Sequence, residues 1–206
     1  MQNIFDRVEK KYLLAENVYI QLIDKISEHI EKDKFFCNQI NNVYYDTDNN
    51  DLLIKSMQKP VYKEKVRVRS YGTPTLDDIV FLEIKKKYNG VVNKRRVCLK
   101  LQEFYNFTQK GIIPKNNQEQ ITKEVVYYFN KYKLKPKVFI SYDRFSYYDK
   151  ENKNFRITFD SNLRSRNFDL NLEKGSYGEL YNLYEKFYIM ELKTLRCIAI
   201  MVRKSN

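Results

Sequence analysis

A ten-residue stretch, residues 62–71, carries a basic side chain at every second position, and this alternation constrains the fold more than any other feature of the sequence. The basic residues are Lys63, Lys65, Arg67 and Arg69. Because a β-strand sends successive side chains to opposite faces, a strand here places all four cations on one face. Val66 and Val68 then lie on the other face, where they can pack against a core. The pattern predicts a half-buried strand with one strongly positive face.

The charge of the whole chain points in the same direction. Lys and Arg number 38 against 26 acidic residues, so the 206-residue chain has a formal net charge of +12. Such an excess points to a polyanionic partner: nucleic acid, a membrane surface or a compound of polyphosphate type. The length suffices for one domain with a hydrophobic core. Since the sequence shows no compositional break and no repeat, we expect a single domain over residues 1–206.

Cysteine usage and the distribution of apolar residues predict a cytoplasmic protein. The three cysteines are far apart and form no Cys-x-x-Cys pair, so neither a metal site nor a disulfide framework follows, and a reducing compartment is expected. The chain is charged from residue 6 onward and has no run of about 18 apolar residues that could span a membrane. The only histidine, His29, is predicted to lie on a helix surface without a catalytic role.

Hydrophobic periodicity and turn residues divide the chain into strands and helices. Strands are predicted over residues 7–14, 43–47, 61–70, 80–88, 91–97, 137–145, 155–160 and 187–193, and helices over 17–30, 99–110 and about 117–131. Asn17 is the expected N-cap of the first helix, Asn89-Gly90 the turn of a hairpin, and Gly111 the end of a helix. The fold class is α+β: an antiparallel sheet of about eight to ten strands, closed into a β-barrel, with three flanking helices.

Several predicted strands repeat the one-sided charge of residues 62–71. The solvated face of an antiparallel sheet is one explanation. Two arguments favour a ligand instead. Most of these charges have one sign, and two unit charges about 6 Å apart repel by about 3 kcal/mol at an effective dielectric of about 20. A closed sheet with inward charges also has a polar lumen, which a multiply charged anion and water would fill.

Carboxylates interrupt the basic set on the same strand faces. They are Glu9, Glu83, Asp160 and Glu191. Internal ion pairing is one interpretation, and a divalent metal held by carboxylate and phosphate oxygens, Mg²⁺ or Mn²⁺, is the other. The sequence contains neither a P-loop nor a GxGxxG motif, so a nucleotide would be bound by side chains. Arg suits this role because its planar fork binds phosphate bidentately.

Seven segments, taken in order, resemble a known family. They are Arg7-Val8-Glu9-Lys10-Lys11-Tyr12, Lys65-Val66-Arg67-Val68-Arg69-Ser70-Tyr71-Gly72, Phe81-Leu82-Glu83-Ile84-Lys85-Lys86-Lys87, Lys94-Arg95-Arg96, Ser141-Tyr142-Asp143-Arg144, Arg156-Ile157-Thr158-Phe159-Asp160 and Met190-Glu191-Leu192-Lys193. The chain resembles, from residue 5 to about 195, the bacterial branch of the VTC-type polyphosphate polymerase domain. That domain belongs to the triphosphate tunnel metalloenzymes of the CYTH-like superfamily.

The resemblance implies a β-tunnel lined by Lys and Arg that binds ATP and a growing polyphosphate chain. The terminal phosphoryl group of ATP would pass to that chain and ADP would leave, with Mn²⁺ or Mg²⁺ as cofactor. The motifs imply as phosphate-binding residues Lys11, Arg67, Arg69, Lys85, Lys94, Arg144 and Arg156. Strand alternation adds Arg7, Lys65, Arg96 and Lys193.

The resemblance also assigns roles to the four carboxylates. Glu191 matches the acidic metal ligand on the last strand of the family, and Glu9 matches an acidic position of related tunnel hydrolases. Glu83 and Asp160 either bind the metal or orient neighbouring basic side chains.

The end of the chain departs from the family pattern. The family continues beyond the Glu-Leu-Lys strand with an amphipathic helix and a Ser-Lys-aromatic motif, neither of which is evident in residues 194–206. We therefore expect the C-terminal helix to be missing or altered, and polymerase activity to be reduced or lost while polyanion binding is retained.

Three alternatives to polymerisation stay open. The same tunnel could hydrolyse tripolyphosphate or a nucleoside triphosphate, with water as acceptor. It could also bind polyphosphate or inositol phosphates without turnover. Nucleic acid ranks last as a partner, because few aromatic residues separate the cations on the basic faces.

Overall fold

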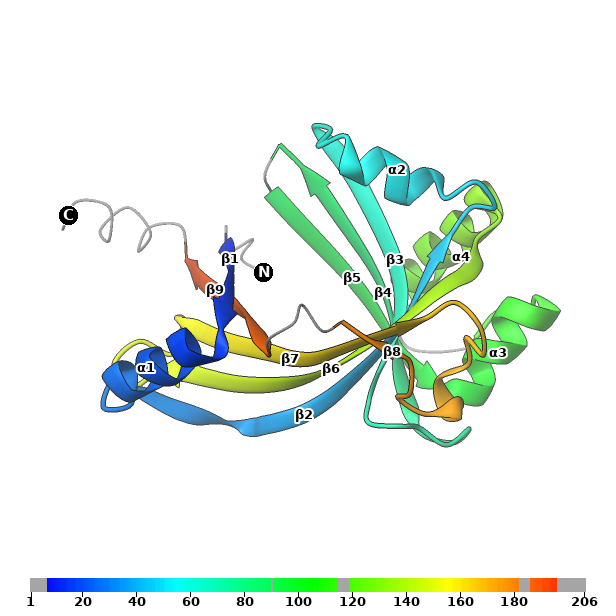
Figure 1. The fold of residues 1–206 in the computed structure, drawn as a ribbon. Coiled ribbons are helices and arrows are strands. Elements are labelled where there is room, and N and C mark those ends of the chain that lie inside the picture. The colour runs from blue at the N-terminus through cyan, green and yellow to red at the C-terminus, as the bar shows by residue number, and fades with distance from the viewer. Residues whose placement is uncertain (1–6, 90, 115–118, 182–185, 196–206) are drawn as a thin grey trace. The chain divides into compact units, whose positions relative to one another are not determined.

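The computed structural model describes residues 7–89, 91–114, 119–181 and 186–195, which contain nine strands and four α-helices (Figure 1). In chain order the elements are β1 (Arg7–Ala15), α1 (Glu16–Ile26), β2 (Ile30–Asp46), α2 (Asp51–Met57), β3 (Tyr62–Tyr71), β4 (Ile79–Tyr88), β5 (Val91–Lys100), α3 (Leu101–Lys110), α4 (Glu119–Tyr132), β6 (Lys135–Asp149), β7 (Arg156–Arg166), the 3₁₀ turn Leu172–Lys174, β8 (Glu179–Leu180) and β9 (Phe187–Leu195). The α+β prediction is confirmed.

The strands are hydrogen-bonded in the order β1-β9-β7-β6-β2-β3-β4-β5, and β8 pairs with β7. The contacts divide the chain into two compact units. The first unit comprises residues 1–39, 142–163 and 180–206, and the second comprises residues 40–141 and 164–179. The long strands β2 and β6 contribute residues to both units. The expectation of one domain over residues 1–206 stays a prediction.

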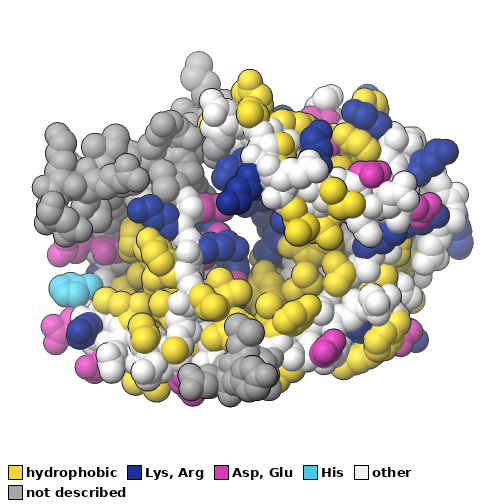
Figure 2. All heavy atoms as spheres, turned by 45° about the horizontal axis from the view of Figure 1, so that its top comes forward, with side chains coloured by type: hydrophobic (Ala, Val, Ile, Leu, Met, Phe, Trp, Pro, Cys, Tyr) yellow, Lys and Arg dark blue, Asp and Glu magenta, His cyan; other side chains and the backbone are white. Residues whose placement is uncertain are grey.

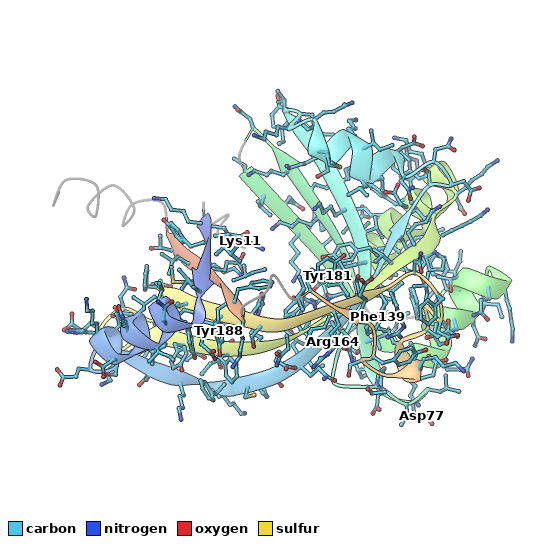
Figure 3. All side chains as sticks on the ribbon, in the orientation of Figure 1. Lys11, Asp77, Phe139, Arg164, Tyr181 and Tyr188 are labelled. Atoms are coloured by element: carbon cyan, nitrogen blue, oxygen red, sulfur yellow. The ribbon has the colours of Figure 1, made fainter. Side chains whose placement is uncertain are left out.

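In the first unit, α1 covers the apolar face of the strands. Ile157 and Phe159 alternate with polar residues on β7, and both are buried beside Tyr188 of β9. Tyr19 of α1 stacks on Tyr188 with ring centroids 3.8 Å apart, and it meets Phe159 edge-on at 5.0 Å. Figure 3 labels Tyr188 on β9, close to α1. The opposite face of β1 and β9 carries the charged pair Lys11 and Glu191 beside the apolar pair Leu13 and Ile189.

In the second unit, α3 and α4 supply the buried partners of β3, β4 and β5. Val66, Leu82 and Ile84 are buried on the apolar face of the strands. They belong to one core with Phe104 of α3 and Val125 of α4. The cations at the alternate strand positions lie on the other face, as the sequence predicted for residues 62–71.

Ion pairs and a buried carboxylate attach α4 to this core. The Tyr128 hydroxyl donates a hydrogen bond to Glu64 Oε1 at 2.7 Å, and Glu64 is buried. Glu124 lies 3.5 Å from Lys86 Nζ and 3.6 Å from Arg95 Nε. Charged residues on the helix-covered side of the sheet are thus used to position α4.

Several predicted boundaries were wrong at the N-terminal end. The first helix ends at Ile26 and not at residue 30, because the Ser27 hydroxyl donates to the Asp24 carbonyl and the backbone turns. β1 leads directly into α1, so the N-cap is Ala15 and not the predicted Asn17. His29 consequently lies in the turn before β2 and not on the helix, although it is exposed as expected (Figure 2, cyan).

Two further elements were incompletely predicted. The strand predicted over residues 43–47 is the end of the 17-residue β2, whose first half lacks a clean polar–apolar alternation. Helix α2 was not predicted at all, since no helix or strand was expected between residues 47 and 61. The carboxylate of Asp46 accepts hydrogen bonds from the backbone amides of Leu52 and Leu53, both at 2.9 Å, and so satisfies the start of this helix. None of the helices in the described part of the chain is long and apolar enough to cross a membrane.

We predict that Phe159→Ala lowers the free energy of unfolding by about 3–5 kcal/mol, because it leaves a cavity in a core that cannot fully collapse. Phe159 is fully buried, whereas Phe35 is 64% exposed, so Phe35→Ala is a matched control with an effect of about 0.5 kcal/mol or less. Denaturant titration measures both values. Equal losses in the two variants would contradict the packing described for the first unit.

Candidate anion-binding site

The register of β3, β4 and β5 arranges the charged side chains of the second unit in rows. Arg67 lies opposite Glu83, which lies opposite Arg96. The next row consists of Lys65, Lys85 and Lys94. Directly opposed residues of antiparallel strands have side chains on the same face. We call the face formed by Lys65, Arg67, Arg69, Glu83, Lys85, Lys94 and Arg96 the basic face.

One carboxylate organises the basic face. Arg67 Nε and Nη2 donate to Glu83 Oε2 at 2.8 and 2.7 Å. Arg96 Nε and Nη2 donate to Glu83 Oε1 at 2.8 and 2.5 Å, and Lys94 Nζ lies 2.7 Å from the same oxygen. Of the two interpretations that the sequence left open for Glu83, these contacts favour internal ion pairing, with partners from neighbouring strands. Three cations around one carboxylate still leave an excess of positive charge.

Neutral polar side chains hold the two arginines of β3 in place. The Tyr44 hydroxyl accepts a hydrogen bond from Arg67 Nη1 at 3.0 Å. Asn42 Oδ1 accepts one from Arg69 Nε at 2.9 Å, while Asn42 Nδ2 donates to the Ile140 carbonyl at 3.1 Å. Burial favours the protonated hydroxyl of Tyr44, yet Arg67 and Arg69 together lower its pKa. The arginines are thus pre-positioned, which reduces the entropy lost on binding an anion.

The close packing of charged side chains on the basic face shifts the pKa values of Glu83 and Lys94. Burial alone would raise the pKa of Glu83, but Arg67, Arg69 and Lys94 hold it well below its usual range. Its contribution to stability is therefore present above the pKa of an unfolded glutamate, about 4.3, and is lost as the pH falls towards the lower folded pKa. Burial lowers the pKa of Lys94 to about 8, although Glu83 acts to raise it.

A second charged set lies in the first unit, on β1, β6, β7 and β9. Strand register places Lys11 opposite Glu191 and Glu9 opposite Lys193. Figure 3 labels Lys11 on β1. Lys193 Nζ lies 3.1 Å from Glu191 Oε2. Burial would raise the pKa of Glu191, but Lys193 and Lys11 keep it below its usual value.

Arg144 and Arg156 of this second set each have an acidic partner. Arg144 Nε and Nη2 donate to the two oxygens of Asp160 at 2.6 and 2.7 Å, and Arg144 Nη2 lies 3.9 Å from Glu191. Arg156 Nη2 donates to Asp33 at 2.6 Å. Asp33 of β2 was missed, because it lies 123 positions from Arg156 in a segment without a regular charge pattern. Tyr44 and Asn42 were also missed, because each binds an arginine more than 20 positions away in the sequence.

The predicted site residues thus form two groups. Lys65, Arg67, Arg69, Lys85, Lys94, Arg96 and Glu83 belong to the second unit, and Lys11, Arg144, Arg156, Lys193, Glu9, Asp160 and Glu191 belong to the first. Arg7 lies on β1 by its backbone, and its side chain is outside the described part of the structure.

The carboxylates do not form a metal site made of protein ligands alone. Among the described residues no three His, Cys, Asp or Glu side chains lie close enough together to hold a metal ion. Both oxygens of Glu83 and both oxygens of Asp160 accept from cations. Mg²⁺ and Mn²⁺ in phosphate sites are held by only one or two carboxylates together with phosphate oxygens and water. Glu191 fits that more open arrangement.

Comparison with known families gives the classification. The family model of the VTC domain matches residues 6–204. The chain belongs to the VTC domain family. The resemblance found in the sequence is thereby confirmed over nearly the whole chain. The predicted change in the C-terminal helix concerns residues 196–206, which lie outside the described part of the structure.

Solved structures share the fold of this VTC domain. A candidate adenylate cyclase from Bacillus halodurans matches with a TM-score of 0.53 at 14% identity, over 91% of this chain and 81% of that one. A candidate adenylyl cyclase from Hippeastrum, described as having a dominant triphosphatase activity, matches with a TM-score of 0.53 at 12% identity, over 97% of this chain and 83% of that one. A search of curated protein sequences finds no match.

We predict that Glu83→Gln lowers the free energy of unfolding by about 3 kcal/mol, because it leaves three crowded cations without their shared carboxylate. Tripolyphosphate should then raise the melting temperature of this variant more than that of the wild type, since the added anion replaces the lost charge. Glu124→Gln is the control, because Glu124 pairs with Lys86 and Arg95 at longer distances on the helix side of the sheet. An equal effect of tripolyphosphate on all three proteins would contradict the role assigned to Glu83.

A second prediction concerns pH. Since the pKa of Lys94 is lowered to about 8, its charge is lost between pH 7 and pH 9, whereas an ordinary lysine stays protonated over this range. Affinity for tripolyphosphate should fall several-fold over that range, and Lys94→Arg should flatten the dependence because Arg stays charged. Calorimetric titration at pH 7, 8 and 9 measures both proteins, and the ligand's own ionisation is common to them. Parallel pH profiles would contradict the lowered pKa.

Proposed function

We propose that the protein is an ATP-dependent polyphosphate polymerase. It would transfer the terminal phosphoryl group of ATP onto a growing polyphosphate chain and release ADP. Membership of the VTC family supports this reading. The observation that carries it is the basic face, where Arg67, Lys94 and Arg96 surround the single carboxylate of Glu83.

The chemistry of phosphoryl transfer suits these residues. The reaction asks a protein mainly to position the phosphates and to neutralise charge on the equatorial oxygens. Arg96 and Lys94 have side chains that are 34% and 41% exposed, so an anion can reach them while Glu83 holds them in place. A phosphate oxygen of the acceptor is itself the nucleophile, so no serine or cysteine nucleophile is required. In our proposal the sheet closes into a barrel, the triphosphate tunnel, and the basic face lines it.

Enzymes of the triphosphate tunnel family use a divalent metal. In our proposal Glu191 would hold Mn²⁺ or Mg²⁺ with phosphate oxygens and water, and Glu9 is a further candidate ligand. When bound, the metal would neutralise charge that develops on the phosphates. Glu83 and Asp160 instead orient the arginines that they bind, Arg67 and Arg96 for Glu83 and Arg144 for Asp160.

Hydrolysis of tripolyphosphate or of a nucleoside triphosphate is the second candidate, since water could replace the acceptor at the same cations. The triphosphatase activity described for the Hippeastrum protein of the same fold favours it. Binding of polyphosphate or of inositol phosphates without turnover is the third. We place the protein in the cytoplasm in all three cases, on the cysteine usage alone.

An assay with ATP and Mn²⁺ tests the proposal when long-chain polyphosphate and free phosphate are measured separately. We expect polymer to accumulate. Free phosphate without polymer would establish hydrolysis instead. Tight binding of tripolyphosphate without either product would establish the binding module.

The double variant Arg67→Ala, Arg69→Ala should weaken tripolyphosphate binding by at least tenfold, because each charge-assisted hydrogen bond contributes about 1.5–3 kcal/mol. The control removes two exposed cations elsewhere, in Lys34→Ala, Lys110→Ala. Both variants lower the net charge equally, so a general effect of charge would weaken binding in both. Such an equal loss would contradict the assignment of the basic face.

A further inference from the structure

Beyond Glu83 and Arg96 the rows of the basic face continue into a partly aromatic surface, bordered by Lys100, which lies opposite Ile79. Beyond the row of Arg67, Glu83 and Arg96, register places Phe81 opposite Arg69 on one side and Cys98 on the other. One step further along the strands, Tyr71 and Ile79 take the corresponding positions. Tyr71 and Ile79 are 49% and 52% exposed, and Cys98 is exposed. We call the surface of Tyr71, Ile79, Phe81 and Cys98 the aromatic end.

The two rings of the aromatic end are fixed relative to each other. Tyr71 and Phe81 meet edge to face, with centroids 5.6 Å apart and an interplanar angle of 79°. The guanidinium carbon of Arg96 lies 4.6 Å from the centroid of Phe81, so the same arginine contacts both Glu83 and the ring. Half-buried Phe81 thus supports Tyr71 from one side, and about half of Tyr71 faces solvent.

The backbone after Tyr71 is also fixed. Ser70 Oγ and Asn41 Nδ2 both donate to the carbonyl of Gly72, at 2.8 and 2.9 Å. Gly72 itself has a φ of 71°, a left-handed conformation that glycine adopts without strain. Tyr71 is therefore an exposed aromatic residue on a rigid support, unlike a side chain on a loose loop.

The spacing along β4 matches the parts of a nucleotide. Phe81 and Lys85 are four residues apart, which is about 14 Å in a strand, and the ring of Tyr71 lies next to that of Phe81, with centroids 5.6 Å apart. An extended nucleoside triphosphate has its base at one end and its three phosphates at the other, on the same length scale. With its phosphates over Lys85, Lys94 and Arg96, its base would reach the aromatic end.

We propose that Tyr71, supported by Phe81, is the stacking platform for the base of a nucleoside triphosphate whose phosphates lie on the basic face. This inference rests on the proposed function. A linear polyphosphate has no group that gains from an exposed aromatic ring, whereas every nucleobase has a π-face that stacks on one. Tyr71 therefore lets the protein discriminate between the nucleotide donor and the polyphosphate product. It favours ligands that carry a base, but it does not distinguish one base from another.

Binding of ATP and of tripolyphosphate to the wild type, Tyr71→Ala and Tyr71→Phe tests the proposal. Tyr71→Ala should weaken ATP binding about tenfold and leave tripolyphosphate binding within about twofold. Tyr71→Phe should restore ATP binding, because the ring is kept. Tyr88→Ala is the control, since Tyr88 is a 64% exposed tyrosine at the other end of β4 and should affect neither ligand.

Comparing the binding of ATP with that of tripolyphosphate distinguishes a failure of this proposal from a failure of the proposed function. If the wild type binds neither ligand, the proposed function is wrong and the platform with it. If tripolyphosphate binds normally and Tyr71→Ala keeps its full affinity for ATP, the platform alone is wrong. An equal loss for both ligands would show that Tyr71 supports the fold of the basic face, and would also overturn the platform.

Alkylation of the wild type gives a measurement that depends on no variant. Cys98 lies opposite Phe81, so a base on the aromatic end should shield its thiol. ATP should slow the reaction of Cys98 with iodoacetamide several-fold more than tripolyphosphate does, as followed by peptide mass spectrometry. Cys37, which is exposed on β2 in the first unit, is the internal reference. Equal shielding by the two ligands would overturn the proposal.

Discussion

The carboxylate of Glu83 is the interaction on which the basic face depends. Like charges at opposed positions of neighbouring strands repel each other, so a nearby counter-charge stabilises the arginines and lysines of the basic face. Glu83 is almost fully buried, and each of its oxygens accepts from at least one guanidinium, so it fixes the side chains of Arg67 and Arg96 across three strands. The buried valines and leucines on the other side of the same strands hold Glu83 at that depth. Core packing and the charged face are therefore two consequences of one strand register.

The first unit applies the same device with other residues. Asp160 holds Arg144, Asp33 holds Arg156 and Glu191 lies beside Lys193. In both units the side chains of these acidic residues are less exposed to solvent than those of the cations that they bind. Such pairs contribute little net stability once desolvation is counted. Their effect is to fix the direction of side chains that would otherwise sample many rotamers, which is what an anion-binding surface needs.

How much could be predicted from the sequence depended on the distance over which each feature acts. Alternation within β3, β4, β5 and β9 is local, and it placed the cations on one face correctly. The Asn-Gly pair between β4 and β5 also indicated their pairing. By contrast, the contacts Arg67–Glu83, Arg96–Glu83 and Arg156–Asp33 join different strands, so local alternation could not assign the partners. Helix α2 was missed because Asp46, which satisfies its first amides, lies at the end of the preceding strand.

The row of Lys65, Lys85 and Lys94 has a consequence for how any ligand arrives. Six cations and one carboxylate make up the basic face, so in solution this face attracts small inorganic anions before it meets its ligand. A polyphosphate or nucleotide must displace them, and their release into the bulk is an entropy gain that shrinks as salt rises, as for other polyanions. Binding of a polyanion at this face is thus an exchange of many counterions for one molecule, and the phosphate and chloride concentrations of the surroundings limit the affinity that the protein can reach.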